Sequence, residues 1–269
     1  MALTHIIIGA GNMGGALLSG WLADGLVKAR NVGIVDPRPG SVAAEAIADG
    51  ASHLGGVADI PQTARVVLLA IKPQMFAGMK ADLSALPDGT LLISILAGTA
   101  LSDLQAAVPD CDVVRAMPNT PASIGLGMTA YVADDALPAD VVETVEAMLG
   151  ACGEVVRVGN DDQINAVTAI SGSGPAYIFH LCEALTGAGV AVGLSEDTAA
   201  RLARQTLIGA SGLLQRSDDT PEQLRVAVTS PGGTTQAALD VLMGEDGMAQ
   251  LMRRAAKAAL DRARELAKG

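Results

Sequence analysis

The sequence predicts an α/β domain with a parallel sheet, followed by an all-helical domain. Three observations lead to this prediction. Short apolar runs alternate with helical patterns in the first half, a glycine-rich turn follows the first run, and strand signals stop near residue 160. Alternating strands and helices imply a parallel sheet that helices cover on both faces. We therefore expect a first domain over residues 1–160 and a helical domain over residues 161–269.

The expected strands are short apolar runs. Two of them, Val66–Ala70 and Thr90–Ile95, are apolar on both faces, as strands of a covered parallel sheet should be. The other expected strands are His5–Ile8, Val32–Val35, Asp112–Met117 and Glu154–Val158. Helical spacing of apolar residues occupies residues 12–25, 41–50 and 139–149.

Only helical patterns follow residue 160. Residues 164–194 predict two helices separated by glycines, and residues 195–215 predict a long amphipathic helix. Ser195 is the expected N-cap of the long helix. A last helix is expected over residues 247–269.

The composition argues against several classes of function. The formal net charge is −11 and aromatic residues make up 2% of the chain, so we expect neither nucleic acid nor an anionic membrane as a partner. The three cysteines are scattered and form no Cys-x-x-Cys pair, which indicates a reducing compartment, the cytoplasm. The three histidines lack the spacing of metal ligands, and no metal site is expected. No signal peptide or membrane span is expected either.

The glycine-rich turn has the pattern G-x-G-x-x-G, from Gly9 to Gly14, between a strand and a helix pattern. This context is typical of the Rossmann-type dinucleotide-binding unit. Gly9 allows the tight turn, Gly11 lets the backbone approach a pyrophosphate, and Gly14 lets the helix pack on the strand. The helix N-terminus offers free N–H groups to the phosphates. We therefore expect NADH or NADPH as the cofactor, with a ligand-free turn as the alternative.

Two charged residues follow the second strand and favour different cofactors. Asp36 lies about 20 residues after the glycine-rich turn, where an acidic residue holds the adenosine ribose hydroxyls of NAD. Arg38 is placed to bind the 2′-phosphate of NADP instead. We expect Asp36→Ser to raise the preference for NADPH and Arg38→Ala to raise the preference for NADH. These two residues leave the choice between the cofactors open.

Two other strand ends carry residues suited to a cofactor, because open α/β sheets bind ligands at the carboxyl ends of their strands. Lys72 and Pro73 place a cation on a stiff turn. The loop RAMPNTPASIG, residues 115–125, is fixed by two prolines, and Asn119 and Thr120 supply it with hydrogen-bonding groups. We expect this loop to orient the nicotinamide. Ordinary turns are the alternative at both places.

The stretch SGSGPAY, residues 171–177, contains a serine between two glycines. It lacks the G-x-S-x-G pattern of a nucleophilic serine, because position 171 is not glycine. We expect its glycines to allow close packing of helices or of the cofactor.

A second glycine-rich turn, Ser230–Gly233, leads into a helix pattern that begins near Thr234. Bare backbone N–H groups at a helix N-terminus favour an anion such as a carboxylate. Thr234 and Thr235 add hydroxyl groups. We expect a side chain at Gly233 to block the anion or to force unfavourable backbone angles. A capped turn between two helices is the alternative.

Together these stretches resemble the pyrroline-5-carboxylate reductases. The resemblance rests on IGAGNMG, AIKPQ, RAMPNTPA, SGSGPAY and VTSPGGTT, in the order of that family and at about its spacing. It implies a Rossmann domain and a helical domain through which two chains interlock, so we expect a homodimer or a multiple of dimers, often a decamer. It also implies the last step of proline biosynthesis, the reduction of 1-pyrroline-5-carboxylate. The family usually prefers NADPH, and Asp36 departs from the small or polar residue expected at its position.

The resemblance and the motifs together assign residues to two ligands. The expected cofactor-binding residues are Ile8, Gly9, Gly11, Asn12, Met13, Gly14, Asp36, Arg38, Ala70, Lys72, Pro73, Ala97, Met117, Pro118 and Asn119. The expected substrate-binding residues are Ser230, Gly232, Gly233, Thr234 and Thr235. Thr235 is expected near the ring nitrogen of the substrate, as the catalytic residue.

The expected reaction needs a hydride at the imine carbon and a proton on the nitrogen. A protonated imine is already electrophilic, so orientation and electrostatics should supply most of the acceleration. Asp161 and Asp218 are candidates for balancing the positive charge, with solvated loop acids as the alternative. Two rival functions stay open: a dehydrogenase or imine reductase of the same build acting on another small carboxylate substrate, and a non-catalytic cofactor-binding protein.

Overall fold

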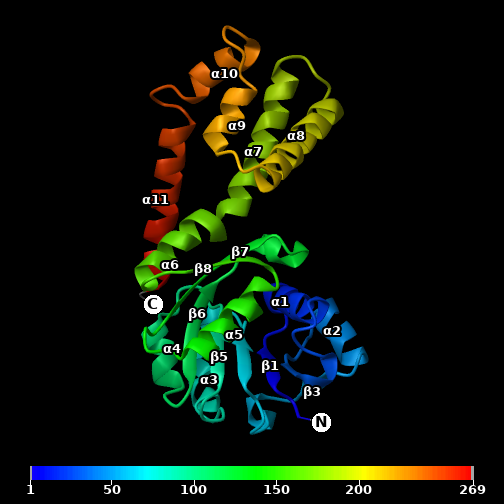
Figure 1. Ribbon diagram of the computed structural model, residues 1–269, viewed down its shortest axis with the longest axis vertical. Coiled ribbons are helices and arrows are strands. Elements are labelled where there is room, and N and C mark those ends of the chain that lie inside the picture. Colours follow the sequence, from blue (N-terminus) through cyan, green and yellow to red (C-terminus); the bar gives the residue numbers. More distant parts are fainter. Residues whose placement is uncertain (1, 268–269) are drawn as a thin grey trace. The chain divides into compact units, whose positions relative to one another are not determined.

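The computed structural model describes residues 2–267 (Figure 1). They form two compact units. The first contains the residues up to Ser173 together with those from Ala259 onward, and the second runs from Gly174 to Ala258. The predicted α/β part lies in the first unit, and the second unit is wholly helical.

The first unit is built on one sheet of eight strands in the order β3-β2-β1-β4-β5-β6-β7-β8. All neighbouring strands are parallel except β6 and β7, which are antiparallel. The strands are β1 His5–Ile8, β2 Val32–Val35, β3 Ser52–Leu54, β4 Val66–Leu69, β5 Leu91–Ser94, β6 Asp112–Met117, β7 Gly127–Ala133 and β8 Gly153–Arg157. The direction of winding reverses between β1 and β4, and open α/β sheets bind ligands at such a point.

The sequence does not predict two of these strands. β3 has only three residues and none of them is buried, so it lacks the apolar run that marks its neighbours. β7 runs back along β6 in the opposite direction, with Met117 facing Ala130. The sequence predicts a uniform series of strand–helix units, so it does not predict a strand that returns directly along its predecessor. The sheet is therefore dominated by parallel pairs rather than wholly parallel.

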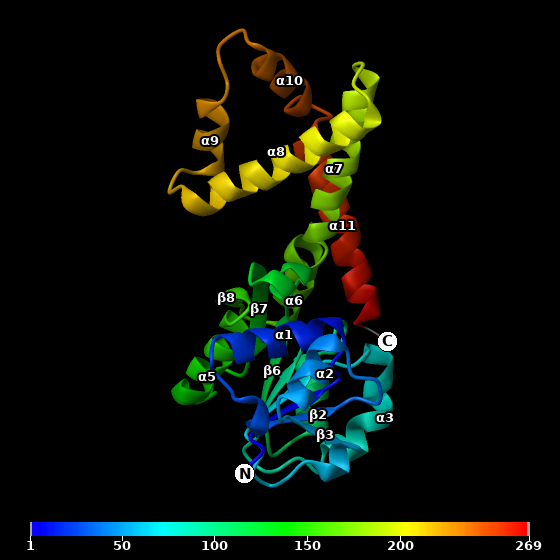
Figure 2. The same cartoon turned by 90° about the vertical axis from the view of Figure 1, so that its right-hand side faces the viewer.

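Helices cover the two faces of the sheet, as predicted (Figure 2), and there are five of them where the sequence shows three helical patterns. They are α1 Asn12–Ala23, α2 Ser41–Ala48, α3 Pro73–Leu83, α4 Leu101–Ala107 and α5 Ala139–Gly150. Side chains of a strand alternate between the faces. In β1, Ile7 packs with α1, α2 and α5, whereas Ile6 and Ile8 pack with α3 and α4. The strands are thus buried on both sides, which explains their continuous apolar sequence.

Trp21 is the largest buried side chain of α1 and packs against α5. It is the only tryptophan of the chain, and it is fully buried. Its indole N–H donates to the carbonyl oxygen of Met148 in α5 at 2.6 Å. His5 meets its ring edge-on, with 6.4 Å between the ring centroids. One side chain therefore joins α1, α5 and β1.

The first compact unit extends past residue 160, the predicted limit of the first domain. Helix α6, Asp161–Val167, lies on the sheet, where buried Ile164 packs against Ala130 and Val132 of β7. A π-helical turn, Thr168–Gly172, continues the chain at the place where the sequence predicts a glycine interruption. Packing against β7, a strand that the sequence analysis missed, holds these residues with the first unit.

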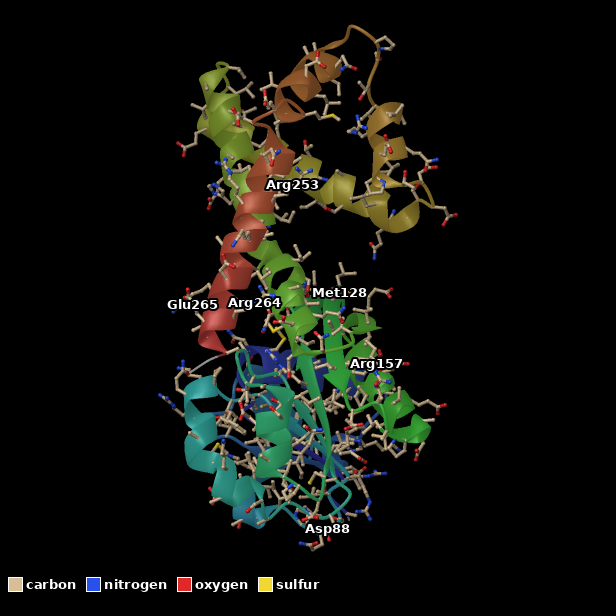
Figure 3. The ribbon with its side chains drawn as sticks, turned by 90° about the vertical axis from the view of Figure 1, so that its left-hand side faces the viewer. Asp88, Met128, Arg157, Arg253, Arg264 and Glu265 are labelled. Atoms are coloured by element: carbon tan, nitrogen blue, oxygen red, sulfur yellow. The ribbon has the colours of Figure 1, made fainter. Side chains whose placement is uncertain are left out.

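The end of helix α11, Met248–Leu266, also belongs to the first unit. Arg264, labelled in Figure 3, pairs with Asp162 of α6, with Nη2 and Oδ2 3.2 Å apart. A Cβ atom on Gly98 would lie 2.9 Å from the carbonyl oxygen of Leu266, and Gly98 has φ +74°. Both the backbone conformation and the close approach of α11 therefore favour glycine at position 98.

The second unit consists of helices. They are α7 Gly174–Ala191, α8 Glu196–Arg216, α9 Pro221–Ala227, α10 Thr234–Leu242 and the first turns of α11. Ser195 caps α8 as predicted, because its hydroxyl accepts the N–H of Thr198 at 3.3 Å. Helices α7 and α8 approach closely at Gly189, where a Cβ atom would lie 2.8 Å from that of Ala199.

Apolar side chains of the second unit are largely exposed in the single chain. Among its residues, all of which the structure describes, only Ala199 and Ala203 are buried. Phe179, Val192 and Val241 are 65%, 82% and 75% exposed. A helical unit with so small a core of its own presents an extended apolar surface, and such surfaces mark sites of association.

Candidate active site

The glycine-rich turn lies where the winding of the sheet reverses. Gly9 has φ +91°, which favours glycine. The Gly9 N–H donates to the carbonyl oxygen of Val35 at 2.9 Å. A Cβ atom on Gly9 would lie 2.7 Å from the carbonyl oxygen of Ala70. The Ala70 N–H in turn donates to Ile8 at 2.8 Å. The structure therefore brings together Ile8, Gly9 and Ala70, three residues of the predicted cofactor site.

The other two glycines of the turn have different surroundings. A Cβ atom on Gly14 would overlap the carbonyl oxygen of Gly9, so the helix can pack this closely only with glycine there. A Cβ atom on Gly11 would meet no atom within 4 Å. Packing within the chain thus explains the glycine at position 14 but not at position 11. Room for an approaching ligand explains the glycine at position 11.

The N-terminus of α1 is open to an anion. Gly11 occupies its N-cap position, no side chain caps it, and its first turn contains no acidic residue. The first intrahelical bond runs from the Gly15 N–H to the Gly11 carbonyl, so the N–H groups of Asn12, Met13 and Gly14 lack helical partners. The open space at Gly11 and these free donors fit the pyrophosphate of a dinucleotide.

Asp36 is engaged by the main chain. Its Oδ2 accepts the N–H of Ala10 and its Oδ1 accepts the N–H of Arg38, both at 2.7 Å. The sequence alone predicts a carboxylate that faces the ribose of a cofactor. The structure adds that each oxygen already holds a peptide group. The Arg38 side chain, in contrast, is exposed beside it.

The remaining strand ends place further predicted residues at the carboxyl edge of the sheet. Lys72 is exposed at the N-cap position of α3, and Pro73 is the first residue of that helix. Ala97 is exposed in the turn after β5, next to Gly98. All three lie after β4 or β5 on the side where β1 ends.

Hydrogen bonds from the Asn119 side chain fix the loop after β6. The Asn119 side chain donates to the carbonyl oxygen of Ser171 at 3.1 Å and accepts the N–H of Met128 at 2.9 Å; Met128 is labelled in Figure 3. The residue is only 9% exposed. Pro118 is also buried, whereas Met117 is partly exposed. The amide that the sequence suggests for a nicotinamide contact therefore also joins three segments of the chain.

Arg115 is an important residue that the sequence analysis missed. It lies on β6, is 2% exposed, and forms an ion pair with Asp161 at the start of α6. Its Nη2 donates to Asn165 at 3.3 Å, while its Nε is buried without a partner in the described part of the chain. A charged residue within the apolar run DVVRAM was the available signal. The charge of Asp161, a candidate for balancing the substrate cation, is paired with Arg115, and Asp218, the other candidate, is exposed.

Replacing Asp161 with alanine should destabilise the protein by about 2 kcal/mol, because it leaves the buried Arg115 guanidinium without its counter-charge. It also removes the acceptor for the Leu101 N–H, 3.1 Å from Oδ2. Asp162→Ala is the matched control, since the neighbouring carboxylate pairs with Arg264 on the surface and should contribute at most about 1 kcal/mol. Urea denaturation of both variants measures the difference. Equal losses would contradict a special role for Asp161.

The second predicted site lies in the second unit, at the start of α10. Helix α10 begins at Thr234, as predicted, with Gly233 as N-cap and no capping side chain. Its first intrahelical bond joins the Ala237 N–H to Gly233, which leaves the N–H groups of Thr234 and Thr235 without helical partners. The Thr235 hydroxyl forms no hydrogen bond within the described residues. Donors for an anion are therefore present at this turn.

One expectation for this turn is wrong in detail. Gly233 has φ −84°, an ordinary value, so a side chain there forces no unfavourable backbone angle. Its N–H is also occupied, because it donates to Ser230 at 3.0 Å. Gly232 is the residue with a left-handed conformation, φ +72°. The turn needs a glycine one position earlier than expected, and a Cβ atom on Gly233 would only press on the Ser230 carbonyl oxygen, 3.1 Å away.

Comparison with known proteins accounts for both units. A family model described as pyrroline-5-carboxylate reductase dimerisation matches residues 161–266, and one described as NADP oxidoreductase, coenzyme F420-dependent, matches residues 5–98. The pyrroline-5-carboxylate reductase of Pseudomonas aeruginosa is 41% identical over 97% of this chain and 95% of its own. The chain belongs to the pyrroline-5-carboxylate reductase family. The family member of Synechocystis is 42% identical over 76% of this chain and 75% of its own length.

Solved structures of pyrroline-5-carboxylate reductases share the fold. The Coxiella burnetii enzyme aligns with a TM-score of 0.88 and 33% identity, covering 100% of both chains. The Plasmodium falciparum enzyme, described with NADP bound, aligns with a TM-score of 0.81 and 25% identity over 98% of both chains. These matches confirm the predicted combination of an α/β domain with a helical domain.

Two kinds of feature are absent from the described residues. None of their helices combines the length and apolar character needed to cross a membrane. None of their His, Cys, Asp and Glu side chains gathers in a group of three or more that would suit a metal ion.

Proposed function

We propose that the protein reduces 1-pyrroline-5-carboxylate to L-proline with a nicotinamide cofactor, the last step of proline biosynthesis. The observation that carries this proposal is the presence of two open anion-binding turns in a chain of this reductase family. One is the α1 N-terminus after Gly11, and the other is the α10 N-terminus after Gly233. The first suits the cofactor pyrophosphate and the second suits the substrate carboxylate.

On this proposal the first unit holds the cofactor. The N–H groups at the start of α1 bind the pyrophosphate, and Gly11 gives it room. Lys72, Ala97 and the loop Met117–Asn119 lie at the carboxyl edge of the sheet and orient the nicotinamide. When bound, the nicotinamide supplies the hydride.

The second unit holds the substrate. Ser230, Gly232, Gly233, Thr234 and Thr235 form the turn that binds the carboxylate, chiefly through the free N–H groups of α10. Thr235 places its hydroxyl near the ring nitrogen. Since the protonated cyclic imine is already electrophilic, the chain acts mainly by orienting it and by favouring the charge distribution of the transition state.

The choice between NADPH and NADH is part of the proposal. We favour NADPH, which the NADP-bound Plasmodium relative and the matched NADP oxidoreductase model support. Arg38, exposed at the end of β2, is the candidate partner of a 2′-phosphate. Asp36 argues less strongly for NADH than its position suggests, because both of its oxygens already bind peptide N–H groups.

Assembly into a homodimer, or a multiple of dimers, follows from the exposed apolar surface of the second unit. This unit buries only two alanines of its own and matches the dimerisation model of the family. Sedimentation at micromolar concentration should show a dimer or a larger even assembly, with little monomer. A stable and active monomer would overturn this part of the proposal. We place the protein in the cytoplasm, which its three free cysteines support.

A steady-state assay tests the function directly. Oxidation of NADPH and NADH is followed by absorbance with 1-pyrroline-5-carboxylate as substrate, and formation of proline is measured in the same mixture. We expect turnover with both cofactors. Folded protein that binds a cofactor yet turns over only another imine or a hydroxy acid would favour the first rival function. Binding of a cofactor without any turnover would favour a non-catalytic protein.

A further inference from the structure

The phosphate-binding turn is fixed by a residue outside it. Asp36 follows β2, yet its Oδ2 accepts the N–H of Ala10 at 2.7 Å, between Gly9 and Gly11. Ala10 is fully buried, so this N–H has no access to water. A carboxylate that accepts a buried N–H forms a strong hydrogen bond, and removing it leaves the donor unsatisfied.

The same segment grips the turn on both sides of this bond. The Gly40 N–H donates to the Ala10 carbonyl oxygen at 3.1 Å, and the Gly9 N–H donates to Val35 at 2.9 Å. The other Asp36 oxygen accepts the Arg38 N–H at 2.7 Å, which fixes the side chain itself. The residues from Val35 to Gly40 therefore enclose the Ala10 peptide, and Asp36 provides the only charged group among these contacts.

We propose that Asp36 is a positioning residue for the phosphate-binding turn and serves NADH and NADPH equally. It fixes the Ala10 peptide, and thereby holds Gly11 and the free N–H groups of α1 in the position that the pyrophosphate needs. The proposal rests on the proposed nicotinamide function. It differs from the role expected from sequence, in which the carboxylate binds the ribose hydroxyls of NAD and repels the 2′-phosphate of NADP.

The two roles predict opposite changes in NADPH binding when the side chain is made neutral. If Asp36 repels the 2′-phosphate, its neutralisation strengthens NADPH binding and weakens NADH binding. If Asp36 positions the turn, its neutralisation weakens both by a similar factor, because both carry the same pyrophosphate. The loss of one hydrogen bond to a charged group corresponds to a factor of about 10 to 100 in affinity.

Asp36→Asn is the decisive variant, tested in the full chain. The asparagine is isosteric but keeps a single acceptor oxygen, so one of the two peptide N–H groups then faces an amide NH2. Calorimetry measures the dissociation constants of NADH and NADPH without substrate. Hydrogen exchange of residues 6–12, followed by mass spectrometry without cofactor, measures the order of the turn. We expect both dissociation constants to rise about tenfold or more and the exchange to accelerate about tenfold.

Two further variants keep the test decisive. Arg38→Ala retains the backbone N–H of residue 38 that binds Asp36. It should therefore weaken the binding of NADPH only and leave the hydrogen exchange of the turn unchanged. Asp36→Glu keeps the charge but moves it by one methylene, and we expect it to weaken the binding of both cofactors. A purely repulsive role instead predicts an unchanged preference between the cofactors and normal NADH binding. Asp36→Glu also distinguishes the two roles if the Asp36→Asn variant fails to fold.

The proposal is overturned if Asp36→Asn binds NADPH more tightly while its turn exchanges as in the parent protein. It is also overturned if Asp36→Glu behaves like the parent. Because exchange is measured without any ligand and binding without substrate, neither result depends on the identity of the substrate. Failure of the parent protein to bind either cofactor would instead count against the proposed function, and the exchange of the turn would still be readable.

Discussion

Gly11→Val should weaken the binding of NADH and NADPH at least about hundredfold while the melting temperature stays within about 3 °C of the parent. Gly11 has φ −74° and ψ −156°, which any residue adopts, and a Cβ atom there meets no atom of the chain within 4 Å. The substitution is therefore tolerated by the protein itself. It fills the space through which a pyrophosphate reaches the N–H groups of α1.

Gly14→Val is the matched control for this result. Its Cβ atom would overlap the Gly9 carbonyl oxygen, so this variant should lose stability together with cofactor binding. Calorimetric titration and thermal unfolding of the two variants separate the effects. Normal cofactor binding by Gly11→Val would show that the phosphates lie elsewhere, and the α1 site would have to be abandoned.

Thr235→Ala should lower kcat/KM for 1-pyrroline-5-carboxylate about ten- to hundredfold without changing the affinity for the cofactor. The Thr235 hydroxyl has no partner within the described residues, so its removal costs the folded chain little. In the proposed site it touches a charged substrate, and one such hydrogen bond is worth roughly 1.5–3 kcal/mol. Steady-state kinetics at saturating cofactor measures the change.

Thr220→Ala is the control for Thr235→Ala, because it removes the same atoms from a threonine with a known structural role. Thr220 caps α9 in a reciprocal capping box with Gln223. Its replacement should lower the unfolding free energy by about 1 kcal/mol and leave kcat/KM unchanged. If Thr235→Ala behaves in the same way as Thr220→Ala, then the turn before α10 is structural rather than part of a substrate site.

The parts of the fold that the sequence predicts are those with a local cause. Two-sided apolar runs mark the central strands, and the glycine-rich turn marks its own position at the end of β1. β3 is missed because none of its three residues is buried, and β7 is missed because it returns directly along β6 where another strand–helix unit is expected. The extension of the first unit to Ser173 is missed together with β7, since Ile164 packs against that strand.

The candidate site shows the same division. Residue types and spacing single out Gly11, Asp36 and the turn before α10. They do not show that Asp36 accepts the N–H of Ala10, because that depends on how β1 and β2 lie side by side. Nor do they show which of two adjacent glycines takes the left-handed conformation, because SPGG permits either one. Long-range pairing and backbone conformation become visible only in three dimensions.

The single tryptophan gives the protein a built-in optical reporter for one of its two units. Trp21 lies on α1 and is fully buried against α5, far along the chain from Gly174–Ala258, which contain no tryptophan. Fluorescence excited at the tryptophan band therefore follows the nucleotide-binding unit alone, whereas the far-ultraviolet circular dichroism of helices follows both. If the two signals melt at different temperatures, the units unfold in separate steps. If they coincide, the helical unit and the sheet unfold as one cooperative body.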